Sequence, residues 1–454
     1  MSSQMRKIMT FVVAATTLLS VGACGTGGSG ADASDQALEY SDIQDALKSD
    51  KDVTLNVWAW SSSTIKPSVE AFEQAYPHIK IDLQSTGAAA DHHIKLKNVL
   101  TSGKGIPDIT QLEYESVPQY AVQGQLLNFE SKSIEENIGK LYNDTAWKAV
   151  HVGDGLYGIP QDQGPQVMYY REDILKQYDI EVPKTWQEFE QAGVKLHKAD
   201  PDKYMGFIDI SNSRAFVNFY RQAQAEPWSI TGLKDIKLDM TSGKSKDVTE
   251  FVQRLIDEGV LDAVSGGTDE FNRAWADGKY VTWLDASWRG GLFRTQNVDL
   301  SGKLRVALPP SWSDANDVVS GDGSGSVYSI LSTIAPEKRA PALAFINWMN
   351  SNSESLGVLK DVFLAAKSYQ ADQSVADQSD DYFGGQKVNS VYFASAKRMG
   401  YLNSLPFNAQ FESDFSDVVT PSMKPHGDLS GAMAKWQDEL KSYGNEQGFN
   451  ITTK

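Results

Sequence analysis

The stretches Val53-Thr54-Leu55-Asn56-Val57 and Ile79-Lys80-Ile81-Asp82-Leu83 decide the fold. In both, apolar residues alternate with polar ones, which is the period of a strand with one buried face. The segment between them carries Val69 and Phe72 on one helix face and stops before Pro77. A second helical stretch follows the second strand. The order strand, helix, strand, helix predicts an α/β fold with a parallel sheet.

A second unit of the same kind starts near Val167. Met168-Tyr169-Tyr170-Arg171 has the composition of a strand. Further on, Thr185 and Glu188 have the spacing of a capping box and predict the start of a helix. More than 400 residues follow the N-terminal segment, which is too many for one core and predicts two domains.

The N-terminus has the pattern of a secretory signal. Arg6 and Lys7 precede an apolar run, and Val21-Gly22-Ala23 leads directly into Cys24, the only cysteine of the chain. This exit resembles a bacterial lipobox, which implies removal of residues 1–23 and a lipid on the Cys24 sulfur. An ordinary signal peptide is the alternative. A transmembrane anchor is disfavoured because the apolar run is short and interrupted.

The glycine-rich segment after Cys24 predicts a flexible tether over residues 24–50, which also hold the start of the body. We therefore expect a lipid-anchored protein on the extracellular face of the cell membrane. The net charge of −17 argues against nucleic acid as a partner and against charge-driven binding to anionic lipid. With its single cysteine in the tether, the body has no internal disulfide and no thiolate metal site.

Several phrases, in order, resemble the extracellular solute-binding proteins of family 1, the carbohydrate-binding lipoproteins of ABC importers. The phrases that carry the resemblance are Trp58-Ala59-Trp60, Pro107-Asp108-Ile109, Gly155-Leu156-Tyr157-Gly158-Ile159-Pro160, Pro183-Lys184-Thr185-Trp186, Leu284-Asp285-Ala286-Ser287-Trp288 and Gly321-Asp322-Gly323-Ser324-Gly325. They span about residues 51–350. Two departures from the family pattern, Ala286 for a glycine and Asp322 within the glycines, stand where a ligand is expected.

The resemblance implies a two-lobed, periplasmic-binding-protein-like fold of type II, with the ligand in a cleft between the lobes. On the family pattern the N-lobe is 51–160 plus 287–325, and the C-lobe is 164–284 plus 326–454. The crossovers between the lobes are then expected near 160–163, 285–287 and 324–327.

Sugar binding requires flat aromatic surfaces for ring faces and planar hydrogen-bonding groups for hydroxyls. Eleven tryptophans are available, and those at strand ends, crossovers and loops are the candidates. The predicted aromatic contacts are Trp60, Trp288, Trp228 and Trp312. The remaining tryptophans considered, predicted to pack in the core, are Trp147, Trp186, Trp348 and Trp436.

Polar candidates come from the same places in the predicted fold. The predicted ligand-binding residues are Glu113 and Tyr114 after a strand, Asp162 and Gln163 on the first crossover, and Asp285 and Asp322 at the later turns. Structural alternatives remain open, since Asp285 also suits the orientation of its turn and Asp322 a plain flexible loop. Tyr401 and Asn408 are further contacts considered late in the chain.

No catalytic or metal-binding motif is present in the sequence. His92 and His93 are adjacent in a segment that we interpret as a linker before a helix. Adjacent residues do not share a helix face, so the two rings are poorly placed to chelate a metal ion together. We therefore interpret them as polar residues on the surface. We expect no catalytic residue, no metal and no cofactor.

The leading hypothesis is a monomeric ABC-importer receptor that captures an oligosaccharide between its lobes and delivers it to the permease. The alternatives are a lipid-anchored glycosidase, since paired carboxylates cannot be assigned from sequence, and a binding protein for another solute such as a polyamine or a metal.

Overall fold

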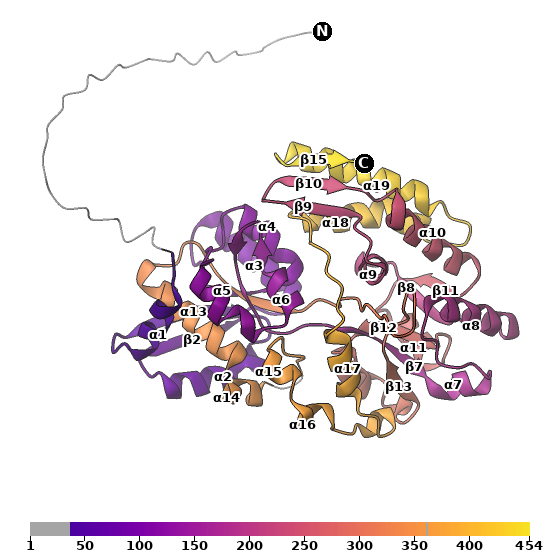
Figure 1. Ribbon diagram of the computed structural model, residues 1–454, viewed down its shortest axis with the longest axis horizontal. Coiled ribbons are helices and arrows are strands. Elements are labelled where there is room, and N and C mark those ends of the chain that lie inside the picture. Colours follow the sequence, from indigo (N-terminus) through magenta and orange to yellow (C-terminus); the bar gives the residue numbers. More distant parts are fainter. Residues whose placement is uncertain (1–36, 360–361) are drawn as a thin grey trace, which may run out of the picture. The chain divides into compact units, whose positions relative to one another are not determined.

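The computed structural model describes residues 37–359 and 362–454 (Figure 1). The predicted signal peptide, the proposed lipid site Cys24 and the tether up to residue 36 therefore lie outside the described residues. Within the part that is described, no helix combines the length and apolar character needed to span a bilayer.

The first two predicted strands form one side of the N-lobe sheet. They are β1 (Val53–Ala59) and β2 (Ile79–Ser85), which pair in parallel with Val53 opposite Ile79. The full order is β2-β1-β3-β14-β6, with β3 at Ile109–Glu113, β14 at Ser326–Ile330 and β6 at Ile159–Pro160. β14 is antiparallel to both of its neighbours. The predicted parallel α/β start is thus present, closed by antiparallel strands.

Helices and one small hairpin complete the N-lobe, and their apolar faces form one core with the sheet. The hairpin is β4 (His151–Val152) and β5 (Gly155–Leu156). The helices are α1 (Tyr40–Lys48), α2 (Ser62–Ala75), α3 (Ala89–Ser102), η1 (Tyr114–Ser116), α4 (Val117–Val122), α5 (Lys132–Asn137), η2 (Gly139–Leu141), α6 (Asp144–Ala149), α13 (Pro336–Ser351) and α14 (Ser353–Val358).

The C-lobe is built on three small sheets. Their orders are β12-β7-β13, β11-β8 and β15-β10-β9. The strands are β7 (Gln166–Arg171), β8 (Gly206–Asp209), β9 (Trp228–Thr231), β10 (Asp235–Leu238), β11 (Leu261–Val264), β12 (Thr282–Ala286), β13 (Leu304–Ala307) and β15 (Asn450–Thr453).

The C-lobe helices cover these sheets and bury two aromatic-rich clusters. They are α7 (Glu172–Gln177), α8 (Trp186–Ala199), α9 (Arg214–Ala223), α10 (Gly243–Asp257), α11 (Asp269–Ala276), α12 (Arg289–Gln296), η3 (Val298–Leu300), α16 (Gln373–Ala376), η4 (Asp381–Phe383), α17 (Val388–Ala396), α18 (Asn408–Asp414), η5 (Phe415–Val419), η6 (Thr420–Ser422) and α19 (Leu429–Glu446). The short helix α15 (Lys367–Gln370) follows the third crossing between the lobes.

The predicted capping box is present at the start of α8. The Thr185 side chain accepts a hydrogen bond from the backbone N–H of Glu188 at 3.1 Å. The Glu188 carboxylate accepts one from the backbone N–H of Lys184 at 2.7 Å, one residue earlier than the standard box.

The structure corrects the predicted division into lobes. Residues 287–325, assigned to the N-lobe, contain α12 and β13, and β13 pairs with β7 of the C-lobe. Residues from 326 onward, assigned to the C-lobe, instead begin with β14, which pairs with β3 of the N-lobe. The N-lobe core extends to Ala365 before the chain returns to the C-lobe. Strand periodicity could not show to which lobe β13 and β14 belong, because a buried strand has the same pattern of apolar residues in either sheet.

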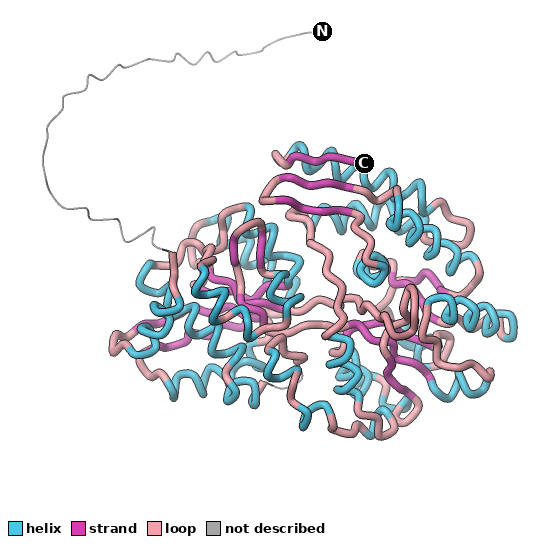
Figure 2. The backbone as a smooth tube through the Cα atoms, viewed as in Figure 1, coloured by secondary structure: helices cyan, strands magenta, loops and turns pink. Residues whose placement is uncertain are grey.

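Three loop segments cross between the lobes side by side (Figure 2). The central segment, residues 161–166, receives a hydrogen bond from Gly323 N–H to Gly164 O at 2.7 Å on one side. On the other side Gln163 N–H donates to Phe363 O at 2.8 Å. The crossings near 160–163 and 324–327 are where we predicted them. The one predicted at 285–287 is absent, because the chain continues there from β12 into α12 within the C-lobe; the third crossing follows Phe363.

Gly325 has no room for a side chain in this crossover. A Cβ added there would lie 2.3 Å from Asp162 O and 2.9 Å from the Cα of Gln163, both backbone atoms that cannot turn away. We predict that Gly325→Ala lowers the free energy of unfolding by about 1–3 kcal/mol, as overpacking does. Urea denaturation measures this.

The matched control for that substitution is Gly291→Ala on α12, where an added Cβ meets nothing within 4 Å. Alanine favours a helix over glycine by up to about 1 kcal/mol, so this variant should be as stable as the parent or slightly more so. Equal stability of the two variants would contradict the steric argument.

Candidate functional site

Three cavities adjoin the crossover and share walls. The first, about 340 Å³, is lined by residues of both lobes. The second, about 350 Å³, has Glu115, Arg221 and Asp322 in common with the first. The third, about 280 Å³, lies against the C-lobe and has Arg214 in common with the second. We call these three cavities together the cleft.

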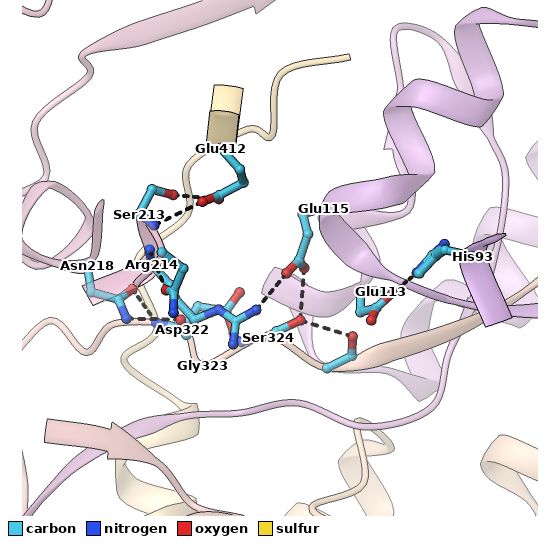
Figure 3. Close-up of polar contacts among 12 residues, drawn as sticks. His93, Glu113, Glu115, Ser213, Arg214, Asn218, Asp322, Gly323, Ser324 and Glu412 are labelled. Atoms are coloured by element: carbon cyan, nitrogen blue, oxygen red, sulfur yellow. Dashed lines mark hydrogen bonds and ion pairs between the residues drawn. The ribbon is translucent and has the colours of Figure 1, made fainter. Parts of the chain in front are cut away.

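An ion pair between the lobes stands where the cavities meet (Figure 3). Glu115 of η1 in the N-lobe accepts from Arg214, the first residue of α9 in the C-lobe, at 3.1 Å. Its other oxygen accepts from the hydroxyl of Ser324 on the crossover at 2.8 Å. Both partners of the ion pair are partly exposed, so we expect only a small contribution to stability. The pair nevertheless connects both lobes to the crossover.

Asp322 lies beside this ion pair and is fixed by its neighbours. Its backbone N–H donates to Asn218 Oδ1 at 2.9 Å, and Asn218 Nδ2 donates back to Asp322 O at 3.0 Å. Its carboxylate accepts from the backbone N–H of Ser324 at 2.9 Å. Burial raises the pKa of Asp322, while the nearby positive charge of Arg221 opposes that rise. The predicted site residue Asp322 thus lies in the cleft, in a fixed turn.

On the N-lobe side, the predicted Trp60 and Glu113 lie around two histidines. Trp60 is half-buried, and its ring meets that of His92 edge to face at 5.3 Å between centroids. Glu113 forms an ion pair with His93. Burial by itself would raise the pKa of Glu113, but the hydrogen bond from His93, the charge of His93 and smaller contributions together outweigh burial and lower that pKa. Neither Trp60 nor Glu113 lines the three cavities.

The prediction that the two histidines are polar surface residues in a linker before a helix is wrong. Both residues lie inside α3, and His92 is fully buried. Its Nδ1 is 2.6 Å from Thr86 Oγ1 and its Nε2 is 3.0 Å from Thr110 Oγ1. A helix that begins at Ala89 turns His92 inward, where it supports the ring of Trp60.

The predicted residues Tyr114, Asp162 and Gln163 meet at the crossover. Tyr114 lines the first cavity, and its hydroxyl donates to Asp162 O at 3.0 Å. The Asp162 carboxylate accepts from the backbone N–H of Ser326 at 2.7 Å and from its hydroxyl at 2.5 Å. This carboxylate therefore joins two crossing segments, and burial raises the pKa of Asp162. Gln163 lines the first cavity and accepts from Gln370 at 3.0 Å.

Trp288 and Asp285, both predicted, line the third cavity. Trp288 is half-buried, and the guanidinium of Arg289 lies 4.8 Å from its ring centroid. The same guanidinium donates to the Asp285 carboxylate at 2.6 Å. Ala286, the departure from the family glycine, places its methyl group close to where Gly323 would carry a Cβ. Aromatic surface and hydrogen-bonding groups thus occur together in this cavity.

Two predicted tryptophans are mainly packing residues. Trp228 is 4% exposed, packs against Phe411 and touches the second cavity at its wall. Trp312 stands apart from the three cavities, with its ring against those of Trp186 and Phe251 in the C-lobe. The assignment of Trp312 to the cleft is corrected here, because its loop folds onto the outer aromatic cluster. The four tryptophans assigned to packing, Trp147, Trp186, Trp348 and Trp436, are buried as predicted.

Sequence reasoning missed three charged residues of the cleft: Glu115, Arg214 and Arg221. Glu115 lies two residues beyond the end of β3, and Arg214 follows the end of β8 by a short loop. Ligands of α/β proteins lie at such strand ends, so the same rule that gave Glu113 pointed to both of them. Arg221, inside α9, carried no such signal. Tyr401 and Asn408, considered late in the chain, line the first and second cavities.

Comparison with known proteins agrees with this architecture. Residues 58–355 match the family described as bacterial extracellular solute-binding protein. An arabinooligosaccharide-binding protein of Bacillus subtilis is 23% identical over 261 residues, 56% of this chain and 59% of that protein. One of the same name from Halalkalibacterium halodurans is 23% identical over 364 residues, 78% of this chain and 80% of that protein.

A solved structure agrees over nearly the whole described chain. The ABC transporter associated binding protein of B. animalis subsp. lactis, in complex with β-1,6-galactobiose, superposes with a TM-score of 0.72 at 26% identity. The match covers 88% of this chain and 100% of that one. The chain therefore belongs to the bacterial extracellular solute-binding proteins. These are binding proteins of ABC transporters and not enzymes, so the glycosidase alternative is excluded and the family prediction is confirmed.

The burial of His92 predicts a pH dependence. Burial, with the neighbouring His93, lowers the pKa of His92 from 6.5 to about 4. The unfolded chain binds a proton there at a higher pH than the folded one. The stability from this site is therefore complete above pH 6.5 and is lost as the pH falls toward 4.

We predict that the parent loses about 3 kcal/mol more than His92→Gln between these two pH values, since each pKa unit corresponds to about 1.4 kcal/mol. Urea denaturation of both proteins across this range measures the difference. Parallel pH profiles would show that folding does not lower the pKa of His92.

Proposed function

We propose that this chain captures an oligosaccharide in the cleft and delivers it to the permease of an ABC importer. The observation that carries the proposal is the composition of the cleft, where aromatic faces stand beside paired carboxylates and guanidinium groups. Trp288, Asp285 and Arg289 line one cavity together, and Tyr114 and Tyr401 line another. Ring faces of a sugar suit the aromatic groups, and its hydroxyls suit the planar polar ones.

The charges of the cleft favour a neutral ligand rich in hydroxyls over an ionic one. Glu115 pairs with Arg214, and Asp285 pairs with Arg289. A hydroxyl both donates and accepts, so it can bridge the two members of such a pair without leaving a charge unpaired. A polyamine would need carboxylates free of guanidinium partners.

The cleft is built for more than one sugar ring. The three cavities share walls, and Arg214 stands between the second and the third. An oligosaccharide that extends from one to the next lies against the Glu115–Arg214 ion pair. The relatives named above bind arabinooligosaccharides, and the superposed structure holds a galactobiose. These two sugar classes are the first to test.

A thermal-shift screen tests the ligand class. Arabinooligosaccharides and β-linked galactooligosaccharides should raise the melting temperature in proportion to the logarithm of their concentration, because they bind only the folded state. Spermidine and amino acids serve as the non-sugar panel. Stabilisation by a member of that panel, with no response to any oligosaccharide, would refute the sugar assignment.

Trp288 provides the sharpest test of where the sugar binds. Loss of its half-buried ring should weaken the best ligand by about tenfold to a hundredfold, the equivalent of about 1.5–3 kcal/mol of apolar contact. Calorimetric titration of Trp288→Ala measures this, beside its melting curve.

Trp348→Ala is the control for Trp288→Ala, since Trp348 is 7% exposed and packs against Phe72 in the N-lobe core. It should lose about 3–5 kcal/mol of stability. Unchanged sugar affinity in Trp288→Ala, or a stability loss as large as that of the control, would show that Trp288 only packs.

The Val21-Gly22-Ala23-Cys24 sequence supports a second part of the proposal, the anchor. We expect residues 1–23 to be removed and Cys24 to carry a lipid that holds the protein at the outer face of the membrane. Mass spectrometry of protein extracted from membranes tests it. A free Cys24 thiol, or an intact Met1–Ala23 segment, would contradict the anchor without affecting the sugar assignment.

A further inference from the structure

Three potential metal ligands converge on the N-lobe at the edge of the first cavity. They are Glu130 just before α5, Glu135 within α5, and His151 at the start of β4. One ligand atom from each lies within 4.8 Å of the others. Their side chains are about one quarter to one third exposed, so a small ion has access from solvent. We call these three residues the Glu130 cluster.

The orientation of the His151 ring turns its Nε2 atom toward both carboxylates. Its Nδ1 is 2.8 Å from Trp147 O, and a carbonyl oxygen can only accept, so Nδ1 carries the ring proton. Its Nε2 lies 2.7 Å from Glu135 Oε1 and 3.5 Å from Glu130 Oε2. A histidine oriented by a carbonyl at one nitrogen, with the other free to coordinate, is the usual arrangement of a metal ligand.

Among the described residues, these carboxylates form an ion pair with this ring alone. Glu130 Oε2 is inaccessible to solvent, and no hydrogen bond reaches it from the described residues. Two carboxylates and an imidazole nitrogen that face one another need a cation between them, which a proton or a metal ion would supply.

The surroundings hold the Glu130 cluster in place. The indole N–H of Trp147 donates to Glu135 Oε2 at 2.9 Å. Gly139 makes that contact possible, since a Cβ there would lie 2.8 Å from Trp147 Nε1. The backbone N–H of Glu130 donates to Asn128 Oδ1 at 3.0 Å. Ligands fixed by such outer contacts need little rearrangement to bind an ion.

We propose that Glu130, Glu135 and His151 bind a divalent transition-metal ion of the Zn²⁺ class, with water in the remaining positions. A set of two carboxylate oxygens and one imidazole nitrogen suits Zn²⁺. Ca²⁺ and Mg²⁺ prefer sites of oxygen ligands alone. The sequence predicted no metal, because the three ligands are separated by loops and helices and form no motif with metal-ligand spacing.

The proposed ion would stabilise one wall of the cleft through a ligand that is part of that wall. His151 lines the first cavity, and Lys148 of α6 lies 4.2 Å from the ring centroid of Tyr401 in the C-lobe. The ion would connect α5 to the β4 strand that follows α6. Its role is structural, and it does not depend on which solute the cleft binds.

Titration of the chelator-treated protein with Zn²⁺ tests the proposal, with melting temperature and calorimetry as readouts. The parent should bind one equivalent of Zn²⁺ and melt at a higher temperature, and Ca²⁺ should have a much weaker effect. Glu130→Gln and His151→Gln should each bind Zn²⁺ at least about tenfold more weakly. Without metal, Glu130→Gln should melt no lower than the parent, because it removes one of two facing carboxylates.

His426→Gln is the control for adventitious binding, since His426 is an exposed imidazole near a single carboxylate of Asp257. It should bind Zn²⁺ like the parent. Three results would overturn the proposal: no Zn²⁺ response in the parent, an undiminished response in Glu130→Gln, or equal stabilisation by Ca²⁺. The first would show that a proton alone occupies the Glu130 cluster.

Discussion

The hydrogen bonds among the three crossover segments are the constraint on which the rest of the molecule depends. Residues 161–166 lie in the middle and are bonded to the 321–326 segment on one side and to Phe363 and Ala365 on the other. Each lobe has its own apolar core, so each is stabilised independently of this joint. A bend at the joint would leave both cores intact, and hinge closure of two lobes around a ligand is a common use of such an arrangement.

The joint also determines the chemistry of the cleft. The Asp162 carboxylate accepts a hydrogen bond from Ser326, and this bond holds two crossings together. Asp322 and Ser324 bring polar groups beside Glu115. Glu115 then meets Arg214 from the opposite lobe. Polar residues near the joint are thus of two kinds, those that hold the crossings and those that face the cavities. Both kinds carry the same functional groups, which is why sequence alone assigned Asp162 and Asp322 the same role.

Local patterns predicted a large part of the candidate site. Trp288 and Asp285 were found from their place after a strand, and both line a cavity. Trp312 was assigned because it lies in a loop, but its ring packs against Trp186 and Phe251. Trp288 and Trp312 differ in the residues that they contact, and those residues lie far away in the chain. The sequence of the loop alone does not reveal them. The Glu130 cluster was invisible for a related reason, since its ligands come from three separate elements.

The sequence by itself predicted several of the strands and helices, an α/β fold of two domains and the supply of aromatic residues, because each depends on local periodicity, chain length or composition. The two-lobed class came from the resemblance to the family. Only the tertiary structure decided that β14 belongs to the N-lobe and β13 to the C-lobe. It also decided that Glu115 and Arg214, 99 residues apart, meet across the cleft. These pairings follow from where the chain crosses between the lobes. The position of each crossing is determined by the burial of apolar residues against partners far away in the chain, and not by the residues of the crossing itself.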